Sequence, residues 1–298
     1  MILVTGATGL NGGELVRRLS ARGVAVRALV RNATGANAPK AAELSRLAGV
    51  EVAEADMARP HSLASALKGI DRAMLISSSD PTMGEVQSAF IDAAALAGVR
   101  YVVKLSGIIP DLNSPFRFAR MHGEIEQHLE ASGMAFTHLR AGEFMHAYFR
   151  QVPSIVNRGA LSLPMADARI ASIDIGDIAD VAADVLTGSG HEGKTYPITG
   201  PDALTMTQVA AALSAATGKP IRYVDVPPAD AKAAQLAAGM PPYLADGLAE
   251  LFAERRKGKE ATVSPVIQTI FKRRPLSFDE FARRYAAVFR GEQPAPRV

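Results

Sequence analysis

The stretch that decides the fold is residues 2–12, ILVTGATGLNG. Its first four residues form a short apolar run of the kind found in buried strands. Three glycines follow with the spacing GxxGxxG, and a helical pattern comes directly after them. In such a turn the first glycine allows a tight bend, the second lets a pyrophosphate approach the backbone, and the third permits close packing. The stretch therefore predicts a strand, a glycine-rich turn and a helix start whose N–H groups bind phosphates.

Short apolar runs alternate with helical patterns over the first 140 or so residues. The expected strands are Ile2 to Thr5, Ala25 to Val30, Val50 to Ala53, Ala73 to Ser77, Tyr101 to Leu105 and Ala135 to Leu139. Glycines at positions 23, 69, 98 and 133 each stand between a helical pattern and the next run, where a helix end favours positive φ. Buried strands joined by helices form a parallel sheet that is covered on both faces. The predicted fold class is α/β, a Rossmann-type doubly wound parallel sheet.

The end of the second expected strand indicates the cofactor. About 20 residues after the glycines, an NAD-binding protein places a carboxylate against the ribose 2′-hydroxyl. This chain has Val30-Arg31-Asn32 there. The Arg31 guanidinium can pair with a 2′-phosphate, and we expect no acidic side chain nearby to repel that phosphate. The sequence therefore favours NADP(H) over NAD(H). Lys40 is a candidate second contact, with a solvated surface lysine as the alternative.

Polar residues follow the other expected strands, at the carboxyl edge of the sheet where such folds bind ligands. Asp56 and Met57 follow the third strand, Ser77 and Ser78 the fourth, and Ser106 the fifth. Ordinary loop chemistry is the alternative for these residues. The predicted cofactor-binding set is Gly6, Thr8, Gly9, Leu10, Asn11, Gly12, Arg31, Asp56, Met57, Ser77, Ser78, Ser106 and Phe144. Phe144 belongs to a cluster with Met145, His146, Tyr148 and Phe149 that we expect near the nicotinamide, although a plain core role is the alternative for its phenylalanines.

The regular alternation stops after about Gly142. Helical patterns cover residues 145–157, 174–186, 206–217, 228–238, 241–256 and 277–289, with strand-like pieces at 195–199 and 221–225. We therefore expect two domains. Residues 1–150 form an NADP(H)-binding Rossmann domain, and residues 151–298 form a smaller, mostly helical C-terminal lobe for substrate or partner, with some segments returning to the sheet.

Composition excludes several classes of protein. The 298 residues are 48% hydrophobic and 21% charged with a net charge of +3, as in ordinary globular proteins. The absence of cysteine excludes disulfides, thiolate metal sites and a cysteine nucleophile, and we expect no metal. No signal peptide or membrane-length apolar run is evident, so the expected location is the cytoplasm, without a membrane partner. The basic run at residues 255–259 is typical of a solvated helix end, so we expect no nucleic-acid partner.

Several stretches together resemble the NmrA-like atypical short-chain dehydrogenase/reductase family. The resemblance rests on the glycine loop, Leu29-Val30-Arg31-Asn32, Ala55-Asp56, Lys104-Leu105-Ser106, His122 to Glu126, Ser132-Gly133, Thr137 to Met145, Ile198 to Pro201 and Ala203 to Met206. This family includes NAD(P)H:quinone reductases of type 2, triphenylmethane-dye and azo-dye reductases, and redox-sensing regulators. The resemblance covers nearly the whole chain and is most specific over the first 145 residues.

The chain departs from ordinary short-chain dehydrogenases at one helix. Those enzymes use a YxxxK pair, in which the tyrosine donates a proton and the lysine binds the nicotinamide ribose. The alignment that the resemblance implies places Phe118 and His122 at these two positions, so the phenol is absent. His122 is therefore our candidate catalytic residue. A neutral imidazole there can hydrogen-bond the ribose or the substrate, and an unperturbed pKa of about 6.5 would allow proton relay. A surface histidine on a long helix is the alternative.

Two functions follow from the resemblance. In the first, the protein is an NAD(P)H-dependent oxidoreductase that passes hydride to a flat, electron-poor small molecule such as a quinone or an azo or triphenylmethane dye. In the second, it is a non-catalytic NADP(H)-sensing regulator that binds a protein partner. We favour the reductase, because positioning supplies much of the acceleration when the acceptor takes hydride readily. The natural acceptor, the proton donor and the oligomeric state are not readable from the sequence.

Overall fold

A computed structural model of the protein describes residues 1–35 and 37–296. In this part of the chain the main sheet has seven strands in the order β3-β2-β1-β4-β5-β6-β9. The strands are β1 Ile2–Val4, β2 Val26–Val30, β3 Val50–Glu54, β4 Arg72–Leu75, β5 Tyr101–Gly107, β6 Ala135–Ala141 and β9 Lys194–Ile198. This arrangement confirms the predicted Rossmann-type α/β fold, and all six expected strands are present.

The strands of the sheet run parallel. Registers are parallel for β1 with β2 and β4, for β2 with β3, and for β4 with β5. Ala135 N donates to Arg100 O, and Gly193 N and Gly142 N donate to Phe136 O and Ile198 O, so β5, β6 and β9 continue in the same direction. All the carboxyl ends therefore lie at one edge. The strand order reverses between β1 and β4, which is where such sheets bind ligands.

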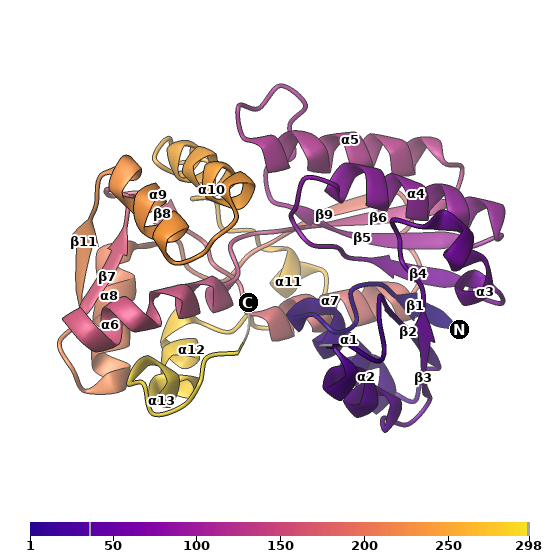
Figure 1. Ribbon diagram of the computed structural model, residues 1–298, viewed down its shortest axis with the longest axis horizontal. Helices are drawn as coiled ribbons and strands as arrows, with labels where there is room; N and C mark the ends of the chain where they lie inside the picture. The colour runs from indigo at the N-terminus through magenta and orange to yellow at the C-terminus, as the bar shows by residue number, and fades with distance from the viewer. Residues whose placement is uncertain (36, 297–298) are drawn as a thin grey trace. The chain divides into compact units, whose positions relative to one another are not determined.

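Helices cover both faces of this sheet. Helices α4 (Met83–Leu96) and α5 (Arg117–Ala131) lie on one face, and α1 (Leu10–Ala21) and α7 (Ile175–Thr187) lie on the other (Figure 1). The remaining helices here are α2 Ala38–Ser45, η1 Pro60–Ser62 and α3 Leu63–Leu67. The glycines at 23, 69, 98 and 133 have φ between 71° and 80°, as their positions after helices predicted. No helix in residues 1–35 or 37–296 is long and apolar enough to cross a membrane.

The contacts divide the chain into two compact units with interleaved segments. Unit 1 comprises residues 1–113, 118–140 and 175–196, and unit 2 comprises residues 114–117, 141–174 and 197–298. Two segments expected among the elements of the second lobe return to the sheet: residues 174–186 form α7, which packs on α1, and residues 195–199 supply most of β9. The expected division into 1–150 and 151–298 stays a prediction about folding domains.

Unit 2 is mostly helical. Its elements are η2 Met145–Gln151, α6 Val152–Arg158, β7 Ala160–Leu163, β8 Arg169–Ile170, β10 Leu204–Thr205, α8 Met206–Thr217, β11 Arg222–Asp225, α9 Pro228–Ala237, α10 Pro242–Arg255, α11 Val266–Thr269, α12 Phe278–Arg284 and α13 Ala286–Phe289. The single helix expected over 145–157 is wrong, because it divides into η2 and α6. Pro153, which has no N–H to donate, lies in the first turn of α6.

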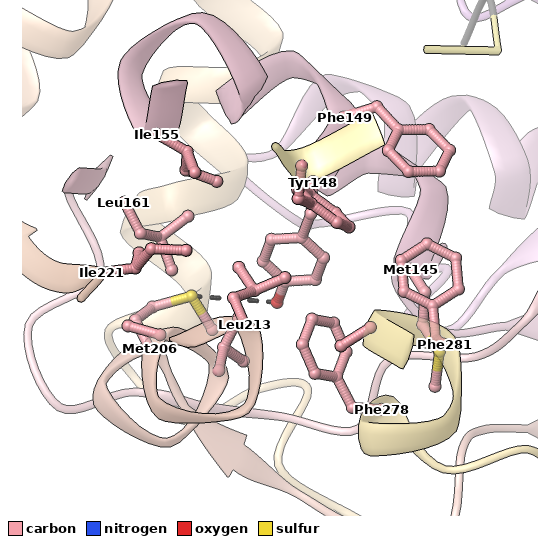
Figure 2. Close-up of a cluster of buried hydrophobic side chains, with 14 of the residues drawn as sticks. Met145, Tyr148, Phe149, Ile155, Leu161, Met206, Leu213, Ile221, Phe278 and Phe281 are labelled. Atoms are coloured by element: carbon pink, nitrogen blue, oxygen red, sulfur yellow. Dashed lines mark hydrogen bonds between the residues drawn. The ribbon is translucent and has the colours of Figure 1, made fainter. Parts of the chain in front are cut away.

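The core of unit 2 contains most of the aromatic cluster that the sequence placed near the nicotinamide. Met145, Tyr148 and Phe149 are buried against α8 and α12, where Figure 2 shows them among Met206, Leu213, Phe278 and Phe281. The Tyr148 hydroxyl points to Met206 Sδ, 3.8 Å away. His146 is buried as well, and its ring meets those of Phe149 and Phe281 edge-on. For Phe149 the structure therefore supports the alternative interpretation, a core residue.

Candidate functional site

The glycine loop, residues 6–12, connects β1 to α1 at the carboxyl edge of the sheet. Gly6 has φ +61°, a left-handed conformation that glycine adopts without strain, and its carbonyl accepts a hydrogen bond from Gly9 N at 2.9 Å. A Cβ on Gly12 would lie 2.3 Å from Gly6 O, so only glycine lets the helix start approach the turn this closely. The predicted tight turn and close packing are both present.

The start of α1 has the properties of a phosphate site. Gly9 is its N-cap, and no side chain caps the helix. Helix starts leave N–H groups without intrahelical partners, and these groups carry the positive end of the helix dipole. Asn11 Oδ1 is buried and has no hydrogen-bond partner among the described residues. Thr8 and Leu10 lie in the same loop and are partly exposed. The donor chemistry here fits the pyrophosphate of a dinucleotide.

Arg31 lies immediately beyond β2, exposed at the same edge of the sheet. Within residues 1–35 and 37–296 the structure gives it no hydrogen bond or ion pair, so its guanidinium has no internal partner to give up for a phosphate. Lys40, from α2, is not merely solvated: its Nζ donates to Thr8 O at 2.9 Å, which adds a positive charge to the glycine loop.

One expectation about this region is wrong. We expected no acidic side chain near Arg31, but the register of β2 with β3 places Glu54 opposite Val30. Glu54 Oε2 accepts a hydrogen bond from Ala33 N at 3.1 Å, two residues after Arg31. The sequence hides this carboxylate because it is 23 residues away along the chain and is brought close only by strand pairing. Its charge opposes that of a 2′-phosphate and so weakens discrimination between NADP(H) and NAD(H).

The remaining predicted residues of unit 1 follow their strands at the same edge. Asp56 accepts from Ala58 N at 3.0 Å and pairs with Arg59, while Met57 is partly exposed. Ser77 accepts from Gln87 Nε2 at 2.8 Å and donates to Ser78 O at 3.3 Å. Both serines follow β4, the neighbour of β1 across the strand-order reversal. These positions suit cofactor contacts, which stay a prediction for each residue.

Phe144 lies in unit 2 and pairs with Ile173 as an isolated bridge. Its side chain is partly exposed, unlike the buried Met145 that follows it. Its predicted contact with the cofactor stays a prediction.

The candidate catalytic residue His122 forms a pair with a buried lysine for which no role was predicted. His122 comes from α5 and Lys104 from β5, and Lys104 Nζ lies 2.9 Å from His122 Nδ1. Lys104 is completely buried and also donates to Ser106 Oγ at 3.2 Å. The imidazole lies against Gly107, where a Cβ would be 3.0 Å from His122 Cδ2. The imidazole is therefore fixed at the carboxyl end of β5 and is only partly exposed.

Burial changes the acid–base properties of both members of this pair. Desolvation lowers the pKa of Lys104 to about 7, against the attraction of Glu126. Desolvation and the neighbouring Lys104 charge hold the pKa of His122 well below its usual value. The expectation of an unperturbed pKa near 6.5 was wrong. An ammonium donates and cannot accept, so with Lys104 charged His122 accepts at Nδ1 and carries its proton on Nε2.

A buried polar network lies behind the pair. Arg140 on β6 donates to Glu126 on α5 at 2.6 Å. Burial raises the pKa of Glu126, but the hydrogen bonds from Arg140 and Ser106 outweigh burial and lower this pKa below its ordinary value. Ser106 is buried and thus contacts both Lys104 and Glu126, and its predicted contact with the cofactor stays a prediction. A buried lysine at this place gave no signal in the sequence, where Lys104 stands in an otherwise apolar run.

The sheet, its reversal point and the glycine-capped helix define the class: a Rossmann-type α/β protein built to hold a dinucleotide. The model of the NmrA-like family matches residues 1–282, and the chain belongs to this family. It is 39% identical to the NAD(P)H azoreductase of Xenophilus azovorans, over 97% of this chain and 99% of that protein.

Two solved structures are similar over the whole fold. The NADPH-dependent quinone oxidoreductase of Escherichia coli, complexed with NADPH, is 33% identical with a TM-score of 0.86, over 95% of this chain and 99% of that one. The triphenylmethane reductase of Citrobacter sp., complexed with NADP(H), is 26% identical with a TM-score of 0.84, over 96% of this chain and 99% of that one. The family resemblance read from the sequence is thus confirmed.

Proposed function

We propose that this protein is an NADPH-dependent reductase that passes hydride to a flat, electron-poor small molecule such as a quinone or an azo or triphenylmethane dye. The observation that carries the proposal is the uncapped, glycine-lined start of α1 at the reversal point of the sheet, with the unpaired Arg31 beside it. The similarity to an azoreductase and to a quinone oxidoreductase over nearly their whole lengths supports the acceptor class.

In this proposal the glycine loop holds the pyrophosphate, and Arg31 pairs with the 2′-phosphate. The bound cofactor supplies the hydride. His122 offers its Nε2–H as a neutral hydrogen-bond donor at the end of β5, and Lys104 holds the imidazole in that tautomer. Because the pKa of His122 is well below its usual value, the imidazole is not a source of a proton at neutral pH. Its role is to orient a ribose or acceptor oxygen.

The test is a steady-state screen of NADPH oxidation with quinones, azo dyes, triphenylmethane dyes and small carbonyl compounds or imines. The reactions are run without oxygen, and the reduced product is identified by mass spectrometry. We expect turnover with at least one of the first three classes. NADPH binding without turnover of any compound would contradict the reductase and favour the non-catalytic regulator.

Two further expectations stay predictions: a cytoplasmic location and the absence of a nucleic-acid partner. Fractionation of the source cells and a salt-dependent DNA-binding assay address them.

A further inference from the structure

Unit 2 contains a pocket of about 830 Å³, which is within the range of small-molecule sites. Its walls come from η2 and from α6, α9 and α10, the last three of which Figure 1 labels. Apolar side chains and two aromatic rings supply most of the lining: Tyr148, Leu163, Met206, Leu244, Leu248 and Phe252. Such a lining favours a flat apolar ligand. Most of the binding free energy would come from the apolar surface that the ligand and the pocket remove from water.

Among the charged residues that line this pocket, Glu143, Arg158 and Arg255 already have partners. Arg255 forms ion pairs with Glu143 and with Glu260. Arg158 donates to Ser154 Oγ at 3.0 Å. Asp230 is exposed in the first turn of α9, where the helix dipole favours a carboxylate. These groups therefore have partners or solvent to balance their charge.

Arg150 differs from the other two arginines of this lining, Arg158 and Arg255. The structure gives it no hydrogen bond or ion pair within the described ranges, 1–35 and 37–296. Its side chain is accessible, yet protein surrounds it closely enough for desolvation to lower its pKa, and no charged neighbour contributes. A guanidinium that has lost part of its hydration without gaining a partner is matched by an anion, which its planar fork can bind through two parallel hydrogen bonds.

We propose that the pocket of unit 2 binds a flat aromatic acceptor that carries an anionic substituent, a sulfonate, carboxylate or phosphate, and that Arg150 selects for this substituent. The apolar wall takes the rings and the guanidinium takes the anion. The assignment of this ligand as the hydride acceptor rests on the proposed function, whereas the binding of an anionic aromatic compound does not.

Binding is tested first, without any turnover. The probes are 8-anilinonaphthalene-1-sulfonate and N-phenyl-1-naphthylamine, which share one ring skeleton and differ in the sulfonate. Both become fluorescent in apolar pockets, and both are titrated into the whole protein with saturating NADP⁺, so that the nucleotide site is not available to them. We expect the sulfonate to bind about tenfold more tightly than the neutral amine. Equal affinities would overturn the proposal.

Variants then locate the anion site. Arg150→Leu should weaken the affinity for the sulfonate about tenfold or more and leave the affinity for the neutral probe unchanged. The sulfonate affinity of Arg150→Lys should lie between those of Arg150→Leu and wild type. Because Arg150 is exposed, these changes leave the core intact. The matched control is Arg158→Gln, whose arginine lines the same pocket but has a partner, and it should change sulfonate affinity much less. Ala231→Trp, on the α9 wall, should weaken both probes by filling the pocket.

Unchanged sulfonate affinity in Arg150→Leu, or an equal loss in Arg158→Gln, would overturn the role of Arg150. Unchanged affinity for both probes in Ala231→Trp would place the site elsewhere.

Turnover is tested with a second matched pair of azo dyes, methyl orange and 4-dimethylaminoazobenzene, which differ in a sulfonate. Arg150→Leu should raise KM for methyl orange about tenfold without changing kcat, and should leave KM for the neutral dye unchanged. An equal change in KM for both dyes would contradict selection for the anion by Arg150. If wild-type protein reduces neither dye nor any other compound of the screen but retains the difference between the fluorescent probes, the proposed function fails and the anion site stands.

Discussion

Two regions at the carboxyl edge of one sheet are built on opposite principles. The glycine loop between β1 and α1 presents main-chain N–H groups, and its geometry depends on glycine at Gly6, which has φ +61°, and at Gly12. The His122–Lys104 pair between α5 and β5 consists entirely of side chains, one of them a buried amine. The first region can be read from spacing alone. The second exists only because folding removes a lysine from water and gives it an imidazole as a partner.

The largest effects are expected in the glycine loop, where two substitutions separate folding from binding. Gly9→Val places a branched side chain where the pyrophosphate approaches, but Gly9 has φ −80° and is exposed, so the fold should survive. We expect NADPH affinity to fall about 100-fold or more with a normal circular dichroism spectrum. Gly12→Val should lose both NADPH binding and the native circular dichroism spectrum, because its Cβ would lie 2.3 Å from Gly6 O. NADPH binding retained by Gly9→Val would place the phosphates elsewhere.

Lys104→Met tests the second region through stability. The folded pKa of about 7 lies below the ordinary value of 10.5. The penalty of burying the ammonium is therefore fully present below pH 7 and decreases as the pH rises toward 10.5. The unfolded chain binds more protons in that window, so wild-type stability rises with pH there. Relative to the variant, the free energy of unfolding of the wild type should rise by on the order of 3 kcal/mol between about pH 7 and about pH 10. Urea unfolding of both proteins at several pH values measures this. A constant difference would contradict the lowered pKa.

Arg31→Ala should weaken NADPH binding about tenfold or more and leave NADH binding nearly unchanged, because the guanidinium pairs only with the 2′-phosphate. Titration by nucleotide fluorescence gives both affinities. Arg46→Ala, a second exposed arginine of unit 1, serves as the control. Equal affinities of wild-type protein for NADPH and NADH would refute the preference.

His122→Ala should lower turnover with a quinone or dye roughly tenfold. Because the pKa of His122 lies well below its usual value and the charged Lys104 holds its tautomer, the loss should be independent of pH below the Lys104 pKa of about 7. His128→Ala is the matched control, since His128 is on the same helix and pairs with Asp92. A wild-type titration near pH 6.5 that Lys104→Met retains and His122→Ala lacks would show that the imidazole does exchange a proton.

The smallest effect is expected at Glu54. Glu54→Gln keeps an acceptor for Ala33 N and removes the negative charge opposite the end of β2. NADPH affinity should rise about threefold, with little change for NADH, since an exposed charge is screened by salt. The gain should disappear at high ionic strength. A gain of equal size for NADH would show that Glu54 does not act on the 2′-phosphate.

Local chemistry explains why most of the fold and the nucleotide loop were predictable. Strands β1, β2 and β5 are mostly apolar runs, and a glycine with positive φ stands between a helix and each of β2, β4, β5 and β6, so residues close in sequence decide these elements. The sequence predicted that some later segments return to the sheet, but not that these are α7 and β9, because an amphipathic helix packs equally well on a sheet or in a helical lobe. Likewise, η2 and α6 share the apolar spacing of one helix, and only the proline marks the break.

The sequence by itself determined the six expected strands, the glycine loop, the cation at Arg31 and the family, because each depends on spacing and on conformational freedom along a short segment. Only the tertiary structure decided the charges around them. Strand pairing brings Glu54 to the loop after β2, and burial shifts the pKa values of Lys104 and His122. Electrostatic effects depend on distance through space and on access of water, and neither is fixed before distant segments pack together.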